Sequence, residues 1–394
     1  MILHMMPSPL DAADWALPIP IHYGLGRLAE LGRICAQAGL RNPLVVTDRG
    51  SRDLPFIAHT TESLRAAGLD SAGFSEVAPN PTDRDIQTGR AAYRVGGHGG
   101  VIAIGGGSGM DAGKAISLVA GNDRDLWSFD YDREPVPVEA EGAFAPLVCV
   151  PTTAGTGAET ESTAMITDSA RTIKRCVWHP RHRPLAAILD PELTVGLPPN
   201  LTAWTGCDAL VHAIEAYCVP QWHPICDGVA LEAMGLIHRW LGVAVDEPDH
   251  LEARGAMLAG SCLAGIAFLK GLGLVHALSH MIGAAHDTHH GLTNAILLPV
   301  VLRYNGHAIA DRVPAMCRAM DLPGRGFDDF YGGTVALLDR LDIPRRLADL
   351  GVEPERAREI AKKALTDPAA ATNPAPASLA QIEGLLLQGI RQAR

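Results

Sequence analysis

Short apolar runs alternate with helical stretches through the first half of the chain, and no other feature constrains the fold as strongly. Four such runs are "NPLVVTD" (42–48), "GGVIAIGGG" (99–107), "APLVCVPTT" (145–153) and "PLAAILD" (184–190). Each has an unbroken apolar core that includes β-branched residues, which is typical of strands buried on both faces of a parallel sheet. The segments between them, such as "GRLAELGRICAQAG", have the apolar spacing of helices. We therefore predict an α/β fold with a parallel sheet.

The pattern changes after "DPELTVGLPPN" (190–200). The remaining sequence is rich in Ala, Leu and charged helix formers and has few strand-like runs, which predicts a domain built of helices. A chain of 394 residues also exceeds the size at which one hydrophobic core usually divides. We therefore predict two domains, an α/β domain over 1–199 and an all-α domain over 200–394. The Pro- and Ala-rich stretch "TDPAAATNPAPAS" (366–378) is expected to be a connector before a last helix.

Composition narrows the class of protein. With 47% hydrophobic and 20% charged residues, the chain is expected to be globular, and no apolar run approaches the roughly 20 residues of a membrane span. The N-terminal stretch lacks the basic and apolar regions of a signal peptide, and the eight cysteines include no C-x-x-C pair. We therefore expect reduced thiols, a cytoplasmic location and no membrane partner.

Charge bears on the kind of ligand. The formal net charge of −11 is spread along the chain, and no block of Lys and Arg stands out. A nucleic-acid-binding protein usually has a basic patch or groove. We therefore expect a small-molecule ligand and no nucleic-acid partner.

A glycine-rich turn joins a strand to a helix in "GVIAIGGGSGMDAGKAI" (100–116). Such a turn lets backbone N–H groups approach a pyrophosphate, and the following helix N-terminus adds partial positive charge. Residues 107–112, "GSGMDA", match the G-x-G-x-x-G/A fingerprint, but the expected acidic strand end is missing from "SFDYDREPVP" about 20 residues later. A tight turn without a ligand is therefore the alternative for this loop taken alone.

Two other features favour nucleotide binding. Asp48 closes the strand "NPLVVTD", where a carboxylate can accept hydrogen bonds from a ribose and would repel a 2′-phosphate. Its alternative role is that of a turn or helix-capping aspartate. The loop "PTTAGTGAE" (151–159) also follows a strand and is dense in hydroxyl groups and backbone donors.

Histidines gather in "VHALSHMIGAAHDTHHG" (275–291), which holds five of the chain's sixteen. In the apolar helical segment "TAWTGCDALVHAIEAY" (202–217), Asp208 and His212 lie four apart and share a helix face. Burying these polar groups without a strong partner is costly, so a metal ion is indicated. One carboxylate with three imidazoles suits Fe²⁺ or Zn²⁺. Spacing alone leaves open which histidines bind and would favour the pair His276 and His280.

Four ordered motifs together resemble the iron-containing, metal-dependent alcohol dehydrogenases. They are "GGGS" (105–108) with Asp111 and Lys114, "TTAGT" (152–156), "DALVHAIE" (208–215) and the segment from His276 to Gly291. The resemblance extends from "IHYGLG" near residue 21 to "TNPAP" near residue 376. It implies a fold like that of dehydroquinate synthase, with a dinucleotide-binding α/β domain and a helical metal-binding domain.

The resemblance also implies roles for single residues. The metal ligands would be Asp208, His212, His276 and His290, and His280 would lie near the substrate. His289 would be structural or support a ligand. The nucleotide would be bound by Asp48, Asn80, Gly106, Gly107, Ser108, Asp111, Thr152, Thr153, Thr156 and Lys174. The chain departs from many relatives at Gly109–Met110 and at Ala375, positions that concern loop rigidity and the substrate's surroundings.

The implied activity is that of an NAD-dependent alcohol dehydrogenase or aldehyde reductase with Fe²⁺, or alternatively Zn²⁺, as metal, acting as a homodimer or larger homo-oligomer. His280 is a candidate to relay a proton between substrate and solvent. Its alternative role is to line the substrate site as a hydrogen-bonding wall residue without transferring a proton. One other activity is an NAD- and metal-dependent lyase or cyclase of the dehydroquinate synthase type. Another is a maleylacetate reductase, against which the metal quartet counts. A non-catalytic metal-binding protein would leave two nucleotide loops without a role.

Overall fold

The computed structural model describes residues 19–138 and 143–391. The N-terminal stretch from which we expected no signal peptide lies outside the described residues. The described chain forms two compact units. The first, the sheet unit, comprises 19–197 and 249–258, and the second, the helical unit, comprises 198–248 and 259–391. Ten residues from the second half of the chain, 249–258, thus group with the sheet unit.

The sheet unit is built on six parallel strands in the order β1-β8-β5-β4-β2-β3. The four predicted runs form β2 (Leu44–Val46), β4 (Val101–Gly105), β5 (Leu147–Pro151) and β8 (Ala186–Leu189). The two edge strands, β1 (Ile21–Tyr23) and β3 (Ala72–Phe74), are three residues each and too short for a recognisable pattern. The predicted α/β fold with a parallel sheet is confirmed.

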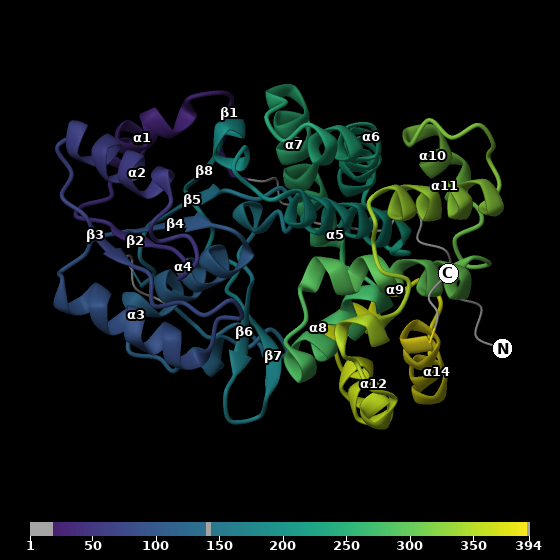
Figure 1. The fold of residues 1–394 in the computed structure, drawn as a ribbon. Coiled ribbons are helices and arrows are strands. Elements are labelled where there is room, and N and C mark those ends of the chain that lie inside the picture. Colours follow the sequence, from purple (N-terminus) through teal and green to yellow (C-terminus); the bar gives the residue numbers. More distant parts are fainter. Residues whose placement is uncertain (1–18, 139–142, 392–394) are drawn as a thin grey trace. The chain divides into compact units, whose positions relative to one another are not determined.

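Helices cover both faces of this sheet (Figure 1). Residues Val101 and Ala103 of β4 pack with α3 (Asp83–Val95) and α4 (Gly107–Ala120). The alternate residues Ile102 and Ile104 pack with α1 (Leu31–Gln37) and α2 (Pro55–Ala66). Because successive side chains of a strand point to opposite faces, a fully apolar run is what a sheet buried on both sides requires.

An antiparallel hairpin of β6 (Ala164–Asp168) and β7 (Ile173–Val177) completes the sheet unit, with short 3₁₀ turns η1 (Arg27–Glu30), η2 (Leu126–Phe129), η3 (Ala158–Thr160) and η4 (Pro191–Thr194). Arg175 of β7 binds the carboxylates of Asp130 and Asp168 and lies over the ring of Trp127. The hairpin is therefore anchored to the unit by charge as well as by backbone pairing.

The helical unit has no strand among its described residues, as the sequence predicts. Its helices are α5 (Pro199–Cys218), α6 (Pro224–Asp246), α8 (Leu274–His286), α9 (His290–Asn305), α10 (Val313–Ala319), α11 (Phe327–Arg340), α12 (Ala357–Leu365), α13 (Pro368–Ala371) and α14 (Leu379–Arg391). Helix α7 (Leu251–Ala267) begins in the sheet unit and ends in the helical unit. The 3₁₀ turns are η5 (Phe268–Lys270), η6 (Leu347–Leu350) and η7 (Pro354–Arg356).

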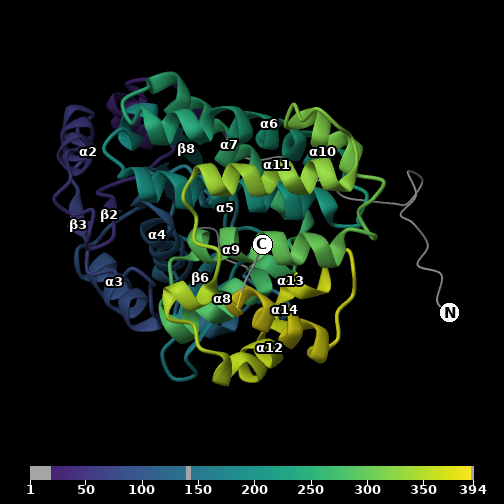
Figure 2. The ribbon, with the colours of Figure 1, turned by 45° about the vertical axis from the view of Figure 1, so that its right-hand side comes forward.

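Helices α5 and α9 form the centre of this unit. In Figures 1 and 2 they lie between α6, α10 and α11 on one side and α8, α12 and α14 on the other. Every residue from Gly206 to Cys218 of α5 is buried. The helices approach closely at Gly291, where a Cβ atom would lie 2.4 Å from the carbonyl oxygen of Trp204. Only glycine fits this contact without a shift of one helix.

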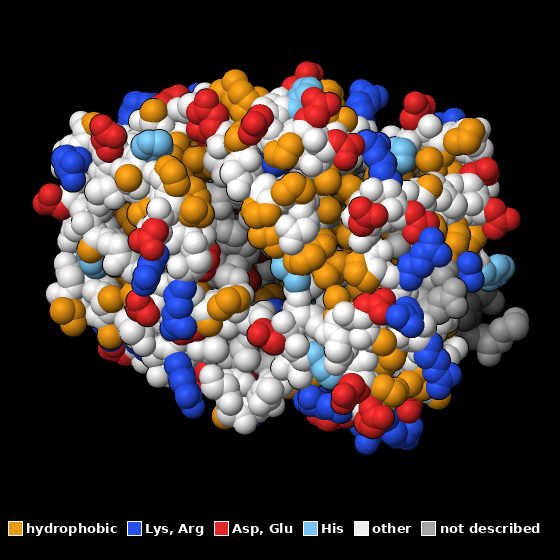
Figure 3. Space-filling view, in the orientation of Figure 1, with side chains coloured by type: hydrophobic (Ala, Val, Ile, Leu, Met, Phe, Trp, Pro, Cys, Tyr) orange, Lys and Arg blue, Asp and Glu red, His pale blue; other side chains and the backbone are white. Residues whose placement is uncertain are grey.

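Two helices, α6 and the segment Leu251–Lys270, are long and apolar enough to span a membrane by length and composition alone. In the second, 67% of the most apolar window is buried inside the protein, as in a core helix. On the face viewed in Figure 3, acidic and basic side chains are interspersed.

Candidate functional site

Three helices of the helical unit bring four candidate metal ligands together. Helix α5 supplies Asp208 and His212 from adjacent turns of one face, α8 supplies His276, and α9 begins with His290. Each side chain offers one ligand atom, and these atoms all lie within 4.8 Å of one another. Three of the four residues are buried, while 26% of the His290 side chain is exposed, which leaves one side of the quartet open to solvent.

The distances within this quartet fit a metal ion. Asp208 Oδ1 lies 3.8 Å from His276 Nε2 and 3.6 Å from His290 Nε2. Two ligands about 2.1 Å from a tetrahedral ion lie roughly 3.4 Å apart, so a small contraction would close the site. Because imidazole and carboxylate are ligands that iron and zinc both accept, the chemistry of the donors fits as well.

Asn294, one turn after His290, lies where lone pairs of Asp208, His276 and His290 converge. Its side chain is fully buried, and Nδ2 lies 2.7 Å from Asp208 Oδ1 and 3.1 Å from the Nε2 atoms of His276 and His290. One amide has two N–H donors for these three acceptors. Asn294 Oδ1 and His212 Nδ1 are buried without a hydrogen-bond partner among the described residues. A cation at this point would supply what a single amide cannot.

Glu215 and Asn373 hold the start of α8, the helix that carries His276. Glu215 accepts hydrogen bonds from the backbone N–H of Gly273 at 3.0 Å and of Val275 at 2.8 Å. Asn373 accepts one from the N–H of Leu274 at 3.1 Å. These bonds satisfy the N–H groups that a helix N-terminus leaves unpaired. Glu215 Oε2 also lies 2.7 Å from Nδ1 of His276, so the carboxylate orients this imidazole.

Burial sets the protonation preferences around the quartet. It lowers the pKa of His276 well below the usual value, and the neighbouring His212 lowers it further. A neutral imidazole is the form that binds a metal. Burial raises the pKa of Glu215 to about 7, against the opposing effect of the backbone N–H donors of Val275 and Gly273.

His280 lies beside the quartet and is not a member of it. Its ring stacks on that of His290, with centroids 5.3 Å apart and planes 11° apart, and its centroid is 5.9 Å from that of His276. Its Nδ1 lies 2.9 Å from Asp367 Oδ2. Spacing alone would favour both His276 and His280 as ligands, but the structure places only His276 in the quartet.

His289 is placed differently from His290. It precedes the first turn of α9, where its side chain accepts a hydrogen bond from the N–H of Leu292, and its ring packs 5.0 Å from that of Trp204. The side chain therefore caps a helix. This position suits the structural role that the sequence suggested for it.

Eight of the ten predicted nucleotide residues follow the carboxyl ends of β2, β4 and β5, while Asn80 lies in the loop after β3 and Lys174 lies on β7. The chain turns at Gly105, whose φ of 142° favours glycine, and a Cβ atom there would lie 3.2 Å from Asp48 Oδ2. A Cβ atom on Gly106 would lie 3.3 Å from Thr153 Cγ2, and one on Gly107 would lie 2.9 Å from Thr156 Cγ2. The order in which the chain adds strands reverses between β2 and β4, since β3 lies beyond β2 while β5 and β8 lie beyond β4, and open α/β sheets bind ligands at such a switch point.

Asp48 is held in a turn. Its Oδ1 accepts hydrogen bonds from the backbone N–H of Gly50 at 2.9 Å and of Ser51 at 3.1 Å, and its Oδ2 accepts one from the Ser51 hydroxyl at 2.8 Å. The turn role suggested as the alternative is thus present. A carboxylate has about four acceptor sites, so this fixed group can still accept a bond from a ligand.

The remaining residues surround the start of α4. The Ser108 hydroxyl donates to the carbonyl oxygen of Pro79, next to Asn80, and the N–H of Thr152 donates to Gly105 O at 2.9 Å. Desolvation raises the pKa of Asp111 to about 6, and the charges of Lys114 and Lys174 oppose this rise.

Lys114 joins α4 to the hydroxyl-rich loop. It forms a fully buried ion pair with Glu161 at 2.5 Å and donates to Ala158 O at 2.7 Å. This anchoring keeps the two predicted nucleotide loops next to each other. Asn80 lies next to them through the contact of Ser108 with Pro79, and the charge of Lys174 acts on Asp111, so the ten predicted residues lie in one region of the sheet unit.

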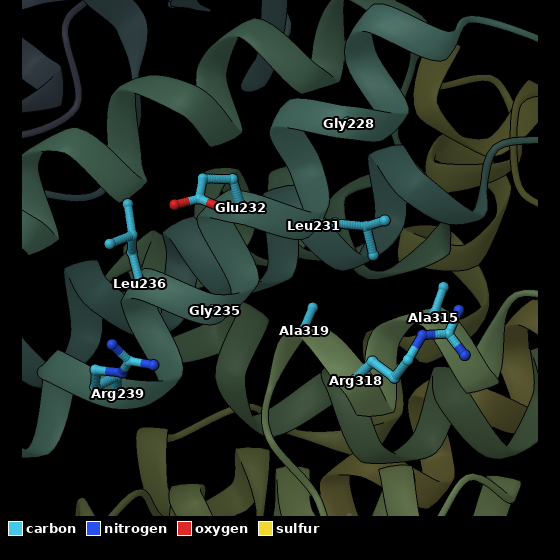
Figure 4. A pocket seen from close by; sticks show the side chains of 9 residues that line it. All are labelled: Gly228, Leu231, Glu232, Gly235, Leu236, Arg239, Ala315, Arg318 and Ala319. Atoms are coloured by element: carbon cyan, nitrogen blue, oxygen red, sulfur yellow. The ribbon is translucent and has the colours of Figure 1, made fainter.

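A hollow between α6 and α10 is a different feature (Figure 4). Its lining consists of glycines, alanines and two leucines together with Glu232, Arg239 and Arg318. None of the predicted site residues is among its lining, and it offers neither a set of metal ligands nor a nucleophile with a base. It is therefore not the site described above.

Comparison with known proteins covers nearly the whole chain. The family model "Iron-containing alcohol dehydrogenase" matches residues 18–191, and the model "Fe-containing alcohol dehydrogenase family, C-terminal" matches residues 202–389. The NAD-dependent methanol dehydrogenase of Bacillus methanolicus is 36% identical over 92% of this chain and 96% of its own length. The 4-hydroxybutyrate dehydrogenase of Cupriavidus necator is 36% identical over 94% and 98%.

A solved structure adds evidence on the fold. The alcohol dehydrogenase from Oenococcus oeni superimposes with a TM-score of 0.89 at 32% sequence identity. The match covers 96% of this chain and 100% of that one. The similarity therefore extends to both units of the chain.

Proposed function

Because the chain belongs to the iron-containing alcohol dehydrogenase family, we propose that it transfers a hydride between a primary alcohol or aldehyde and NAD(H). The observation that carries the proposal is the convergence of one carboxylate and three imidazoles in the helical unit. Relatives named as dehydrogenases of methanol and of 4-hydroxybutyrate support the substrate class.

The metal in this proposal is Fe²⁺, with Zn²⁺ as the alternative ion, and Asp208, His212, His276 and His290 would hold it. When bound, the ion supplies Lewis acidity that lowers the pKa of a substrate hydroxyl. Glu215 binds Nδ1 of His276 and so leaves Nε2 as the lone-pair donor toward the quartet. The partly exposed side of His290 is where we place the substrate.

The nucleotide loops of the sheet unit bind the cofactor. Backbone N–H groups at the start of α4 and in the loop Thr152–Thr156 would receive the pyrophosphate, because a glycine-rich turn before a helix lets these groups approach it. Asp48 accepts hydrogen bonds from the adenosine ribose and disfavours a 2′-phosphate. When bound, NAD would supply the nicotinamide for hydride transfer to or from the substrate carbon.

His280 moves the proton. Its ring is stacked on that of His290, beside the quartet, and 12% of its side chain is exposed. An imidazole in this place can pass a proton between the substrate oxygen and solvent. A role as a wall residue only would leave kcat and the pH–rate profile of His280→Ala unchanged.

We extend the proposal to a cytoplasmic homodimer or larger homo-oligomer. All eight cysteines are free thiols, which suits a reducing compartment. The edge strand β1 carries exposed Tyr23 and is followed by exposed Leu25, at 49% and 56%. A strand edge that is unpaired among the described residues and lies next to apolar side chains suits contact with a second copy. Light scattering on the protein as it elutes from a size-exclusion column measures the number of subunits in the oligomer.

The lyase or cyclase alternative can be distinguished from an alcohol dehydrogenase by the net redox balance of NAD. In a reaction of the dehydroquinate synthase type, NAD is reduced and reoxidised within one turnover, whereas an alcohol dehydrogenase accumulates NADH. We expect net NADH absorbance when the protein loaded with Fe²⁺ or Zn²⁺ is mixed with NAD and a panel of primary alcohols. Turnover of any substrate without net NADH would favour the alternative.

Alanine variants of the quartet test the metal centre. Each of Asp208→Ala, His212→Ala, His276→Ala and His290→Ala should lose bound metal and NADH formation and retain NAD binding by fluorescence titration. His289→Ala is the matched control, because it removes a neighbouring imidazole that caps α9. Full metal content in His290→Ala together with its loss in His289→Ala would show that the ligand is misassigned.

A further inference from the structure

Asp367 uses its two carboxylate oxygens for two separate contacts. It precedes the short helix α13, and its Oδ1 accepts a hydrogen bond from the backbone N–H of Ala369 at 2.9 Å. Its Oδ2 lies 2.9 Å from Nδ1 of His280. Only 5% of the Asp367 side chain is exposed, so water does not compete strongly for either oxygen. One oxygen thus anchors the carboxylate to the backbone while the other faces the imidazole.

The contact with Asp367 decides which nitrogen of His280 carries the hydrogen. A carboxylate oxygen accepts, so Nδ1 of His280 donates, and in the neutral ring Nε2 is then the acceptor. Nε2 has no hydrogen-bond partner among the described residues. Stacking on His290 limits rotation of the ring. Asp367 therefore sets the tautomer of His280, and Asp367 and His290 together set the position of its ring.

We propose that Asp367 is a positioning residue, which fixes the ring and the Nδ1–H tautomer of His280 so that Nε2 is presented to the substrate oxygen. The inference rests on the function proposed above and adds a residue to it. A carboxylate that orients an imidazole is a recurrent device where the second ring nitrogen exchanges a proton with substrate. Its alternative is a helix cap alone, which serves α13 and has no effect on His280.

The variant Asp367→Ser separates the two roles. Serine is a good helix cap, so the bond to Ala369 can be kept, but its hydroxyl is too short to reach His280 in the same way. We expect kcat for alcohol oxidation to fall by about tenfold or more. Metal content, KM for NAD and the melting temperature should stay close to those of the wild type. Asp125→Ser is the matched control, because Asp125 caps η2 and contacts no site residue.

A double-mutant cycle with His280 tests whether Asp367 acts through the imidazole. In the His280→Ala background, Asp367→Ser should leave kcat unchanged, since there is no ring left to position. A similar loss of kcat in both backgrounds, or no loss in the single variant, would overturn the proposal. Loss of metal from Asp367→Ser would overturn it too.

A spectroscopic measurement keeps the test independent of activity. Nitrogen chemical shifts of ¹⁵N-histidine-labelled protein, with His280 assigned from the His280→Ala spectrum, should report hydrogen on Nδ1 in the wild type and a changed tautomer in Asp367→Ser. Hydrogen on Nε2 in the wild type would overturn the proposal. Absence of net NADH in the wild type with every alcohol would instead refute the proposed function, and the tautomer measurement would still decide how Asp367 acts.

Discussion

Replacing Glu215 by glutamine should weaken metal binding without touching a ligand. The carboxylate accepts from Gly273 N–H, Val275 N–H and His276 Nδ1 at 3.0, 2.8 and 2.7 Å. Glutamine has nearly the same shape but only one acceptor oxygen, and its NH₂ group must face at least one of these donors. The imidazole can relieve the conflict by moving its hydrogen from Nδ1 to Nε2. That hydrogen then occupies the lone pair aimed at the quartet.

The size of the effect follows from that competition. Loss of a carboxylate that orients a metal-binding histidine typically costs 10–100-fold in affinity, which is about 1.4–2.8 kcal/mol. A second effect is expected in the metal-free protein, where a buried N–H donor left unpaired costs about 1–3 kcal/mol of unfolding free energy. Both effects come from one substitution, so they must be measured separately.

Competition with a chromogenic chelator gives the Zn²⁺ affinity of wild type, Glu215→Gln and Glu232→Gln. Glu232 lies exposed on α6 and controls for the lost charge. Urea unfolding of the metal-free proteins gives the stability change. An affinity within twofold of the wild type in a folded Glu215→Gln protein would refute the reasoning, and Glu215 would then serve only to cap α8.

Two further predictions concern cofactor choice and pH. The wild type should favour NAD over NADP by at least about tenfold in kcat/KM, because the Asp48 carboxylate and the 2′-phosphate of NADP are like charges, whose contact costs several kcal/mol when partly desolvated. Asp48→Gly should narrow this ratio by improving kcat/KM for NADP. An unchanged ratio would leave Asp48 with its turn role alone. Burial lowers the pKa of His182 to about 3, with the charge of Lys114 adding to the effect. In the folded state the His182 imidazole therefore stays neutral as the pH falls, whereas in the unfolded state it takes up a proton below its pKa of 6.5. The stability that neutral His182 contributes is present above pH 6.5 and is lost as the pH falls toward 3. Between pH 6.5 and 5.0 this amounts to about 2 kcal/mol, which should be missing from the pH dependence of His182→Gln in urea unfolding; parallel curves for the two proteins would contradict it.

The sequence by itself determined the fold class and most of the chemistry. Runs such as 99–107 have an unbroken apolar core, here Val101 to Ile104, which a strand needs when helices cover both faces of a sheet, and they form β4 and its neighbours. The spacing of Asp208 and His212 places them on one helix face, a local property of the backbone. The motif resemblance then pointed to His290, where spacing alone would have favoured His280.

Only the tertiary structure decided how the candidate ligands are held. Glu215 meets His276 across 61 positions, Asn294 meets Asp208 across 86, and Asp367 meets His280 across 87. The stretch that contains Asp367 looked like a connector. Its role depends on how α13 packs against α8, and such packing is set by the shape and volume of many side chains together. Hydrogen-bond partners so far apart in sequence leave no periodic signal, because periodicity records only which face of its own element a residue occupies.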